Sequence, residues 1–536
     1  MTVKEIPPRK AFPPSLSSWC WWLLPLLGVV LFLVPLISPA VVQPKWDEFI
    51  YAFDSQRILN GQVPYRDFFN FIPPAVYYVL AAIALPFGRV TLTIARYASL
   101  AVVLVNWILL RKALEWAGWS RIHALLLSLV YPICIYPFWP VYSHHWLVQT
   151  ASMFFLWLLV APALRERDLA RSFLIGLCAG FAGLMLQTEA LYLAVGSLAL
   201  LLLEARGRGL AARVAALGAG WAVPILGGYL PLLAEGAGYG MIRDLVFWPL
   251  THYSAEGNDN ARTLLSDLPI RLQVLWEGAD WKTDLWRTIP IVLSGSALYL
   301  LLVMTILAVV VAVFVNFGGA LKRHSFRHPQ EGMAVLVTVL ILGIFPLGRP
   351  DWLRFLFLFL FVLALWLVVW GQTGVSGAAR RIIMGTAIAL LLAGFFYQSR
   401  WAWYRFPTMQ ELTDVDSPVR EDSLNRWLHS PGVLGPDDTV AALYEGGEVY
   451  LYGAKPAIGY TFFTPLSENY NSLKDHETVA KQMKENRPRW VLVPMALVRA
   501  FLDPASPVGA LIRRDYRLVG QIGGTAIYGR LPRKPA

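Results

Sequence analysis

The sequence predicts a mostly α-helical protein: a polytopic bundle of about 11 transmembrane helices with juxtamembrane helices, followed by a small C-terminal α/β domain. Three observations predict this fold. Of the 536 residues, 57% are hydrophobic and only 15% are charged, whereas soluble domains are nearer a quarter charged. The apolar residues form runs long enough to cross a bilayer, which takes roughly 20 residues. The Lys and Arg residues lie in short clusters between those runs.

The charge pattern excludes a nucleic-acid partner as the reason for the net charge of +11. Short basic clusters between apolar runs are typical of cytoplasmic loops and need no polyanion. The three cysteines, Cys20, Cys134 and Cys178, all fall inside apolar runs. We therefore expect neither a disulfide framework nor a thiolate metal site.

Eleven apolar stretches are predicted to span the membrane: 19–42, 90–110, 122–140, 146–164, 172–188, 190–204, 211–234, 289–315, 331–347, 352–371 and 381–398. With a cytoplasmic N-terminus, every loop on the inner side is basic, as the positive-inside rule requires. An odd number of spans then puts residues 399–536 outside, on the side of the first large loop, 43–89. We therefore expect a multi-pass protein of the inner or plasma membrane, with a membrane domain at 1–398 and an external domain at 399–536.

The segment 73–88 is apolar but shorter than a usual span. Counting it as a span would invert all later loops and put the basic clusters outside. We expect it to lie flat in the outer interface, anchored by Tyr77 and Tyr78.

The first large loop carries an acidic pair directly after the first span. Asp47 could cap a helix whose apolar positions recur at helical spacing, at Phe49, Ile50, Phe53 and Ile58. Gly61 suits the position after that helix, and Pro64 stops its continuation. Two interpretations remain open. In one, Asp47 caps, Glu48 favours the helix dipole and Asp67 opens a turn; in the other, these carboxylates act at the water–lipid boundary as a general base or metal ligands.

The loop resembles that of the GT-C glycosyltransferases. The resemblance rests on Asp-Glu after the first span, an amphipathic helix, Asn-Gly-x-x-Pro-Tyr-x-Asp-Phe-Phe, Pro-Pro-x-x-Tyr-Tyr, and then Phe87, Gly88, Ala95 and Arg96. It is nearest to the branch of protein O-mannosyltransferases and aminoarabinose transferases that act on lipid A. The resemblance implies a polyprenyl-phosphate sugar donor and a lipid, glycan or protein acceptor. It implies that Asp47 is the base, that Glu48 and Asp67 are secondary acids holding the acceptor or a divalent cation, and that Tyr65 contacts substrate.

Other candidate site residues lie near later external boundaries. His144 and His145 could bind a metal or handle protons, or form an interfacial hydrogen-bonded pair, since adjacent histidines generally point apart on a helix. Arg349 and Arg354 could clamp the donor phosphate, with Arg354 preferred, or pair with Asp351 and reach to headgroups. No cofactor is certain; the candidates for a divalent cation site are Asp47, Glu48 and His144.

Two further segments leave alternatives open. Gln187, Thr188 and Glu189 form either a tight turn between two spans or a substrate contact. The loop 235–288 is long and aromatic, which suits a lid or an acceptor contact, but no spacing in it specifies chemistry. Its notable residues are His252, Tyr253, Glu256, Asp259, Trp276 and Trp281.

The tail is predicted to hold strands at 439–444, 448–452 and 490–494. A helix is expected at 475–486, with Val479 and Met483 on its apolar face, and a closing hairpin at 517–522 and 525–531 around Gly523-Gly524. Its charges are scattered, so we expect it to bind the acceptor or to cover the site.

The function expected from these features is transfer of a sugar from a polyprenyl-phosphate donor to an acceptor on the external face. Two other classes remain. A transporter or flippase of lipid-linked sugars would have two similar halves with broken helices at matching positions, and no such repeat is visible. A non-catalytic assembly subunit would keep the topology but tolerate loss of Asp47.

Overall fold

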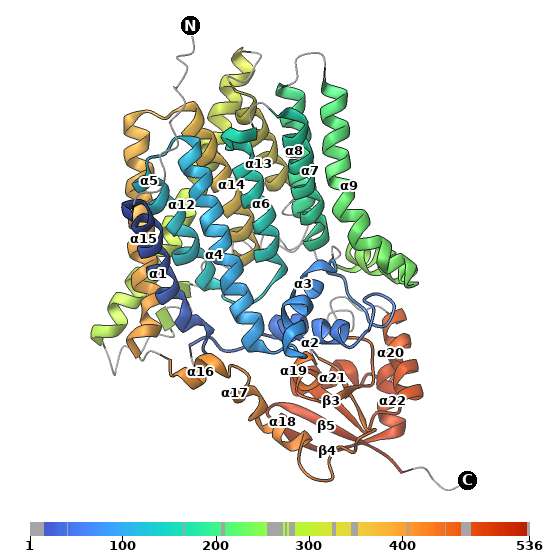
Figure 1. The fold of residues 1–536 in the computed structure, drawn as a ribbon. Coiled ribbons are helices and arrows are strands. Elements are labelled where there is room, and N and C mark those ends of the chain that lie inside the picture. Colours follow the sequence, from blue (N-terminus) through green and yellow to red (C-terminus); the bar gives the residue numbers. More distant parts are fainter. Residues whose placement is uncertain are drawn as a thin grey trace.

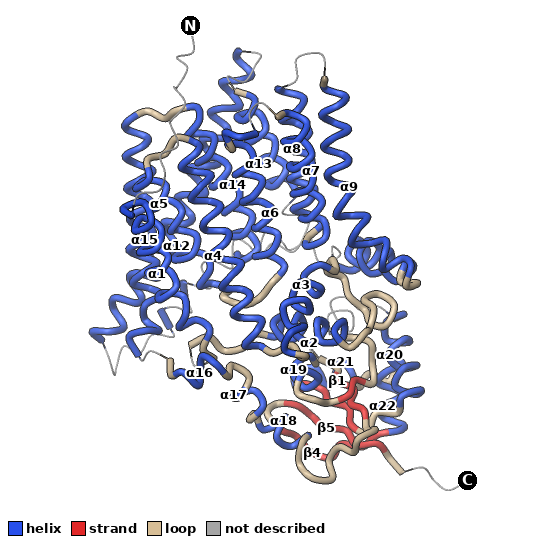
Figure 2. Tube along the Cα trace, viewed as in Figure 1, coloured by secondary structure: helices blue, strands red, loops and turns tan. Residues whose placement is uncertain are grey.

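The computed structural model describes residues 16–39, 41–164, 167–204, 209–253, 272–273, 276–277, 285–323, 328–344, 352–404, 407–444, 446–461 and 473–532. Long helices form a bundle, and a small domain containing a sheet packs against one end of it (Figure 1). The described strands all lie in that small domain (Figure 2). The predicted fold class is confirmed.

Helices occupy all eleven stretches predicted to span the membrane. They are α1 (Leu16–Leu33), α4 (Leu92–Ala117), α5 (Arg121–Val130), α6 (His144–Val160), α7 (Asp168–Met185), α8 (Gln187–Glu204), α9 (Leu210–Ala234), α12 (Leu285–Arg323), α13 (Pro329–Ile344), α14 (Trp352–Thr373) and α15 (Gly377–Tyr404). Within the described residues, eight helices are long and apolar enough to cross a membrane. With 17 and 16 residues, α6 and α13 are shorter. The chain is an integral membrane protein.

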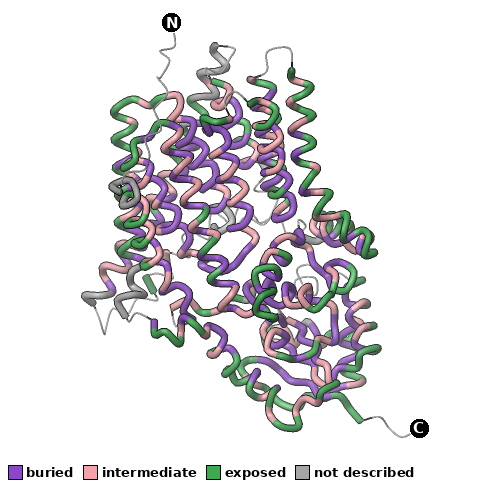
Figure 3. Tube along the Cα trace, in the orientation of Figure 1, coloured by how far each residue is buried: buried purple, intermediate pink, exposed green. Residues whose placement is uncertain are grey.

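Glycines let α7 and α9 approach each other very closely. A Cβ at Gly220 of α9 would lie 2.0 Å from the carbonyl oxygen of Phe173, and one at Gly176 of α7 would lie 2.1 Å from that of Leu217. Inside a bilayer the hydrophobic effect does not drive helices together. Small residues at such crossings stabilise the pair instead, because they let the two backbones pack closely. This contact holds α9 at the edge of the bundle, where most of its length is exposed (Figure 3).

The tail domain contains a five-stranded mixed sheet. Its strand order is β2 (Lys455–Pro456), β1 (Thr439–Ala442), β3 (Trp490–Pro494), β5 (Thr525–Arg530) and β4 (Tyr516–Ile522). β1 pairs in parallel with β2 and β3, whereas β5 runs antiparallel between β3 and β4. Alternate residues of β3 enter two cores: Val491 packs with α20 (Leu473–Asn486) and α22 (Pro507–Asp515), and Leu492 packs with α18 (Ser423–Leu428) and α19 (Gly447–Leu451).

Most predicted tail elements are confirmed. The helix at 475–486 lies inside α20 and buries Val479 and Met483. The hairpin turn has φ values of 55° at Gly523 and 79° at Gly524, a conformation that favours glycine at both positions. The strand predicted at 448–452 is wrong, because α19 forms there. Gly447 at its start lies against the backbone of α2, where a Cβ would come 2.7 Å from the carbonyl oxygen of Phe49; the apolar residues that follow are buried by this tertiary contact, not by strand pairing.

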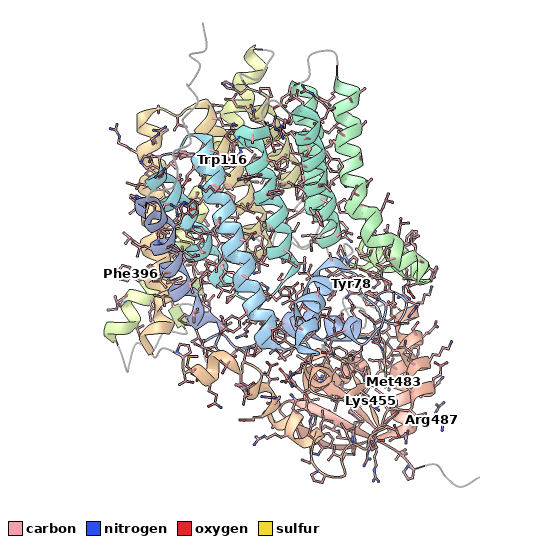
Figure 4. The ribbon with its side chains drawn as sticks, in the orientation of Figure 1. Tyr78, Trp116, Phe396, Lys455, Met483 and Arg487 are labelled. Carbon is pink, nitrogen blue, oxygen red and sulfur yellow. The ribbon has the colours of Figure 1, made fainter. Side chains whose placement is uncertain are left out.

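The first loop and the tail lie at the same end of the bundle (Figure 1), in keeping with the prediction that they share one side of the membrane. The loop forms α2 (Trp46–Leu59) and α3 (Ala75–Ala84), which lie between the bundle and the sheet (Figure 1). Tyr78 of α3 lies at this junction, whereas Trp116 of α4 lies toward the opposite end of the bundle (Figure 4).

The interfacial segment at 73–88 is a ten-residue helix, α3, followed by a short turn of helix, η2 (Leu85–Phe87). Ten helical residues rise about 15 Å, half of a bilayer core. Tyr78 is 39% exposed and is free to meet the interface as predicted, but the same prediction for Tyr77 is wrong. Tyr77 is fully buried, and its hydroxyl donates to the Oδ1 of Asn70.

The connection from α15 to the tail is anchored on α4. The predicted domain boundary at 399 falls inside α15, which continues to Tyr404, and α16 (Met409–Thr413) and α17 (Ser417–Arg420) follow. The buried Asp416 accepts hydrogen bonds from the backbone N–H of Leu92 at 2.9 Å, the N–H and hydroxyl of Thr93 at 3.2 and 2.9 Å, and the hydroxyl of Tyr452 at 2.9 Å. A carboxylate at a helix N-terminus satisfies otherwise unpaired N–H groups, so the tail caps α4.

Candidate functional site

The acidic pair lies in the first turn of α2. The prediction that Asp47 caps this helix is wrong, because the helix begins one residue earlier, at Trp46. Glu48 closes the N-terminus instead: its Oε2 accepts the backbone N–H of Lys45 at 3.0 Å. At the other end Gly61 has φ +84°, as predicted for the residue after the helix. The first turn therefore presents Asp47 beside a fixed Glu48.

Glu48 forms a buried, two-pronged ion pair with Arg96 of α4. Arg96 Nε donates to Glu48 Oε1 and Arg96 Nη2 to Oε2, both at 2.8 Å, and neither side chain is exposed. The remaining guanidinium nitrogen, Nη1, donates to the carbonyl oxygen of Ile37 at 2.8 Å. The pair ties α2 to the end of the first span and to α4. It also occupies both oxygens of the carboxylate.

Asp47 is half-buried and shares a helix face with Tyr51 and Asp54, which follow at i+4 and i+7. The Tyr51 hydroxyl lies 2.5 Å from the Nδ1 of His144, the first residue of α6. The structure therefore brings together two sequence-predicted elements, the first turns of α2 and α6, through Tyr51, which the sequence did not single out.

The two histidines do not point apart, which corrects the expected geometry. Their ring centroids lie 4.1 Å from each other, and the ring of His145 stacks on Phe357 of α14 at 4.6 Å. The pair sits in the first turn of α6, where Ser143 Oγ accepts the N–H of His145. The rings are packed between Tyr51 and Phe357. Neighbouring aromatic rings, which sequence spacing does not reveal, thus decide their direction.

Asp67 and Tyr65 shape the loop. Asp67 Oδ2 accepts the N–H of Val63 at 2.7 Å, which is the predicted turn, and Arg66 pairs with the same carboxylate. This hydrogen bond from Arg66 holds the pKa of Asp67 below its usual range. Tyr65 is buried with φ +66°, and its hydroxyl donates to the carbonyl oxygen of Ile72 at 2.7 Å. These contacts account for both residues structurally; a substrate contact for either stays a prediction.

A buried polar network, missed by the sequence reading, follows Asp47 along α2. Asp54 is fully buried, and its two oxygens accept the side-chain amide of Asn70 at 3.0 Å and the hydroxyl of Thr461 at 2.7 Å. The backbone N–H of Asn70 donates to Asp244 at 3.3 Å. Burial raises the pKa of Asp54 to about 7 and that of Asp244 to about 6. The sequence did contain a signal for this network: Asp54 follows Asp47 by seven residues, which places both carboxylates on the same face of an amphipathic helix.

The remaining candidates are placed only in part. Arg349 lies outside the described residues; Arg354 stands in the first turn of α14, and its side chain lies outside them too. The chain turns at Leu186, between α7, which ends at Met185, and α8, which begins at Gln187, so the predicted turn lies just before 187–189 and these residues form the first turn of α8. Glu189 is nevertheless buried inside the bundle, where its Oε2 lies 3.4 Å from the side-chain amide nitrogen of Gln149.

Only part of the loop 235–288 is described. The segment 238–253 is helical, and Trp276 donates its ring N–H to the hydroxyl of Ser296 at 3.0 Å. Glu256, Asp259 and Trp281, like the side chains of His252 and Tyr253, lie outside the described residues.

The described residues do not form a metal-binding set. No group of three or more His, Cys, Asp or Glu side chains converges among them. Of the three predicted ligands, Glu48 is already paired with Arg96 through both oxygens, and His144 shares its Nδ1 with Tyr51. A cation would have to displace these partners. Within the described part of the chain, the side chains therefore do not fit a divalent cation.

An apolar groove of about 1080 Å³ runs along the bundle beside this site. Four helices line it, for example through Ile83 of α3, Tyr97 of α4, Leu147 of α6 and Phe181 of α7. On α4, Tyr97 directly follows Arg96, the partner of Glu48, and Leu147 lies three residues after His144. These positions place the groove near the end of the bundle where α2 and α6 meet, although its lining residues include none from α2.

No protein-family model matches the sequence, and no curated protein matches it either. Solved structures do match. ArnT from Cupriavidus metallidurans bound to undecaprenyl phosphate has a TM-score of 0.54 at 13% identity, covering 96% of this chain and 98% of that one. The apo state of the same protein gives 0.52 at 13% identity, with 96% and 99% covered. The apo oligosaccharyltransferase of Archaeoglobus fulgidus gives 0.48 at 13% identity, with 96% and 75% covered. The agreement with ArnT covers nearly all of both chains, bundle and tail together, so this chain has the fold of ArnT.

Proposed function

We propose that this protein is a membrane glycosyltransferase that moves a sugar from a polyprenyl-phosphate donor to an acceptor at the tail-bearing end of the bundle. The observation that carries the proposal is an apolar groove along α4 and α6, near the end of the bundle where Tyr51 of α2 meets His144 of α6. The groove would hold an isoprenoid chain along α4 and α6. Asp47, Tyr51 and His144 stand where those helices meet α2. The ArnT fold, solved with undecaprenyl phosphate, supports the same reading.

Asp47 is proposed as the general base. It would accept the proton of an acceptor hydroxyl as that oxygen attacks the anomeric carbon of the donor sugar. The bond from that carbon to the phosphate oxygen would break, and the electron pair would leave with polyprenyl phosphate, so the sugar inverts its configuration. General-base assistance typically contributes about 10²–10⁴-fold to the rate.

Glu48 is better assigned as a positioning residue than as a second catalytic acid. Both its oxygens bind Arg96, so it has no free oxygen with which to hold an acceptor. It fixes the first turn of α2 and with it the direction of Asp47. Arg354, in the first turn of α14, is proposed to neutralise the departing phosphate, since a guanidinium matches phosphate with two parallel hydrogen bonds.

We also propose that the tail-bearing end faces outside the cytoplasm. The basic clusters predicted to be cytoplasmic join spans at the opposite end, for example between α4 and α5. A reporter fused after Arg121 should be cytoplasmic; an external reporter would reverse the orientation.

The decisive experiment measures release of polyprenyl phosphate from polyprenyl-phosphate sugars by the purified protein in nanodiscs. Parent protein should release it in the presence of acceptor extract. We expect Asp47→Asn to slow release by about 10²–10⁴-fold, while Asp437→Asn, which alters a fully exposed tail carboxylate, should behave as the parent.

Three outcomes separate the functional classes. Release that depends on Asp47 supports the transferase. Movement of the intact lipid-linked sugar across the bilayer without release would indicate a flippase. Neither activity, with full function of Asp47→Asn in cells, would indicate an assembly subunit. Near-parental release by purified Asp47→Asn would refute the assignment of the base.

A further inference from the structure

The helical segment 238–253, directly after α9, has an exposed apolar face that the proposed reaction does not use. It consists of α10 (Gly238–Ile242), η6 (Arg243–Phe247) and η7 (Pro249–Tyr253). Its large exposed apolar side chains are Tyr239 (73%), Ile242 (50%), Val246 (47%), Phe247 (59%) and Leu250 (69%). Residues 242, 246 and 250 follow one another at helical spacing, so with Phe247 beside them they form a single stripe. We call these four residues the outer stripe; Tyr239 is not part of it, because its hydroxyl accepts a hydrogen bond from Nζ of Lys474 in the tail at 3.3 Å.

The opposite face of the segment is fixed on the first loop. Asp244 is buried and accepts the backbone N–H of Asn70. Trp248 is 4% exposed, and its ring centroid lies 4.9 Å from that of Phe71. Gly240 abuts Tyr65, whose carbonyl oxygen would lie 1.9 Å from an added Cβ. Because the inner face is held at three points, the segment cannot rotate to bury the outer stripe in the protein.

The end of α9, which directly precedes this segment, also exposes apolar residues. α9 ends at Ala234 with Leu230 and Leu233 exposed. After α9 the chain turns and runs at the level of α3, between the bundle and the tail (Figure 1). The outer stripe thus continues the lipid-facing surface of the spans at the height where the bundle ends.

We propose that 238–253 is a membrane-surface helix whose outer stripe lies in the boundary between lipid headgroups and acyl chains. An amphipathic helix with aromatic and aliphatic residues on one face lies in this way, in the plane of the interface. Continuity with the spans favours lipid over a second copy of the chain or a soluble partner. The inner face then connects this surface helix to Asn70, whose backbone N–H donates to Asp244. The Asn70 side chain is hydrogen-bonded to Asp54 on α2, the helix that holds Asp47. The inference does not depend on the proposed function.

Depth-sensitive spin labelling tests this directly. In a Cys20→Ala background, whose other cysteines are buried, single variants Ile242→Cys, Val246→Cys and Leu250→Cys carry a nitroxide on the outer stripe. Met495→Cys and Leu518→Cys, on exposed apolar residues of the tail, are matched controls. The full-length protein is placed in lipid nanodiscs, and collisions of each label with oxygen and with a water-soluble nickel chelate are measured.

At the outer stripe, the ratio of oxygen to nickel accessibility should be severalfold higher than at the tail controls. A ratio equal to that of the controls would mean that the stripe faces water. Protection from both reagents would mean that protein covers it. Either result would overturn the proposal. Because three positions are labelled, a single variant that fails to fold leaves the other two to decide.

Discussion

Breaking the buried pair of Glu48 and Arg96 should destabilise the protein more than almost any other polar substitution in it. The pair has two hydrogen bonds of 2.8 Å and complete burial, and each partner makes one further bond, to Lys45 and Ile37. Glu48→Gln keeps the shape of the side chain but leaves the guanidinium without its counter-charge. Removing one partner of such a pair costs about 3–5 kcal/mol. The free energy of unfolding, measured by titration with a denaturing detergent, should fall by this amount.

The double variant Glu48→Gln/Arg96→Met tests the reasoning further. Replacing both charges removes the unpaired cation, and loss of a whole buried ion pair costs far less than leaving one of its charges unpaired. Stability should therefore return to within about 1–2 kcal/mol of the parent, a recovery of roughly 2–3 kcal/mol relative to Glu48→Gln. A single variant that unfolds like the parent would refute the claim that the pair is buried and intact.

The same two variants separate positioning from catalysis. If Glu48 acts only by holding the first turn of α2, the double variant should regain part of the polyprenyl-phosphate release lost in Glu48→Gln. If Glu48 touches the acceptor, the double variant should stay as inactive as the single one despite its recovered stability. Asp47→Asn in the double-variant background should remain inactive in either case.

Three more substitutions test other contacts. Burial raises the pKa of Asp54 from the ordinary 3.8 to about 7, so between these values the folded protein keeps a proton that the unfolded chain releases. The parent's free energy of unfolding should therefore fall as the pH rises from about 4 to 7 and stay constant above pH 7. Asp54→Asn cannot titrate, so its stability relative to the parent should rise by up to about 4 kcal/mol over this range, measured by melting curves recorded from pH 4 to 8. Gly220→Ala, which would meet Phe173, should cost about 1–3 kcal/mol, whereas Gly218→Ala, with nothing within 4 Å, should not lower the melting temperature. Asp416→Ala should cost about 1–2 kcal/mol through the lost cap of α4; an equal loss in the exposed Asp414→Ala would show that the cap contributes nothing specific.

The membrane architecture could be predicted because hydropathy is a local property. Each span needs only its own run of apolar residues, and the sides follow from the basic clusters next to it. The closing hairpin was equally local, since Gly523-Gly524 supplies the two positive φ values that its turn requires. The strand expected at 448–452 failed because contact with α2, nearly 400 residues earlier in the chain, decides the structure there.

By itself, then, the sequence determined the helical bundle and the α/β tail, and it singled out the acidic pair as a candidate site. Only the tertiary structure distinguished the members of that pair. It gave Glu48 a buried partner 48 residues away, left Asp47 half-buried on the face that leads to Tyr51, and tied Asp54 to Thr461 in the tail. A carboxylate has the same local sequence signal whether it meets solvent, a guanidinium or a hydroxyl. Which of these it meets depends on the helices that pack against it, and those come from distant parts of the chain.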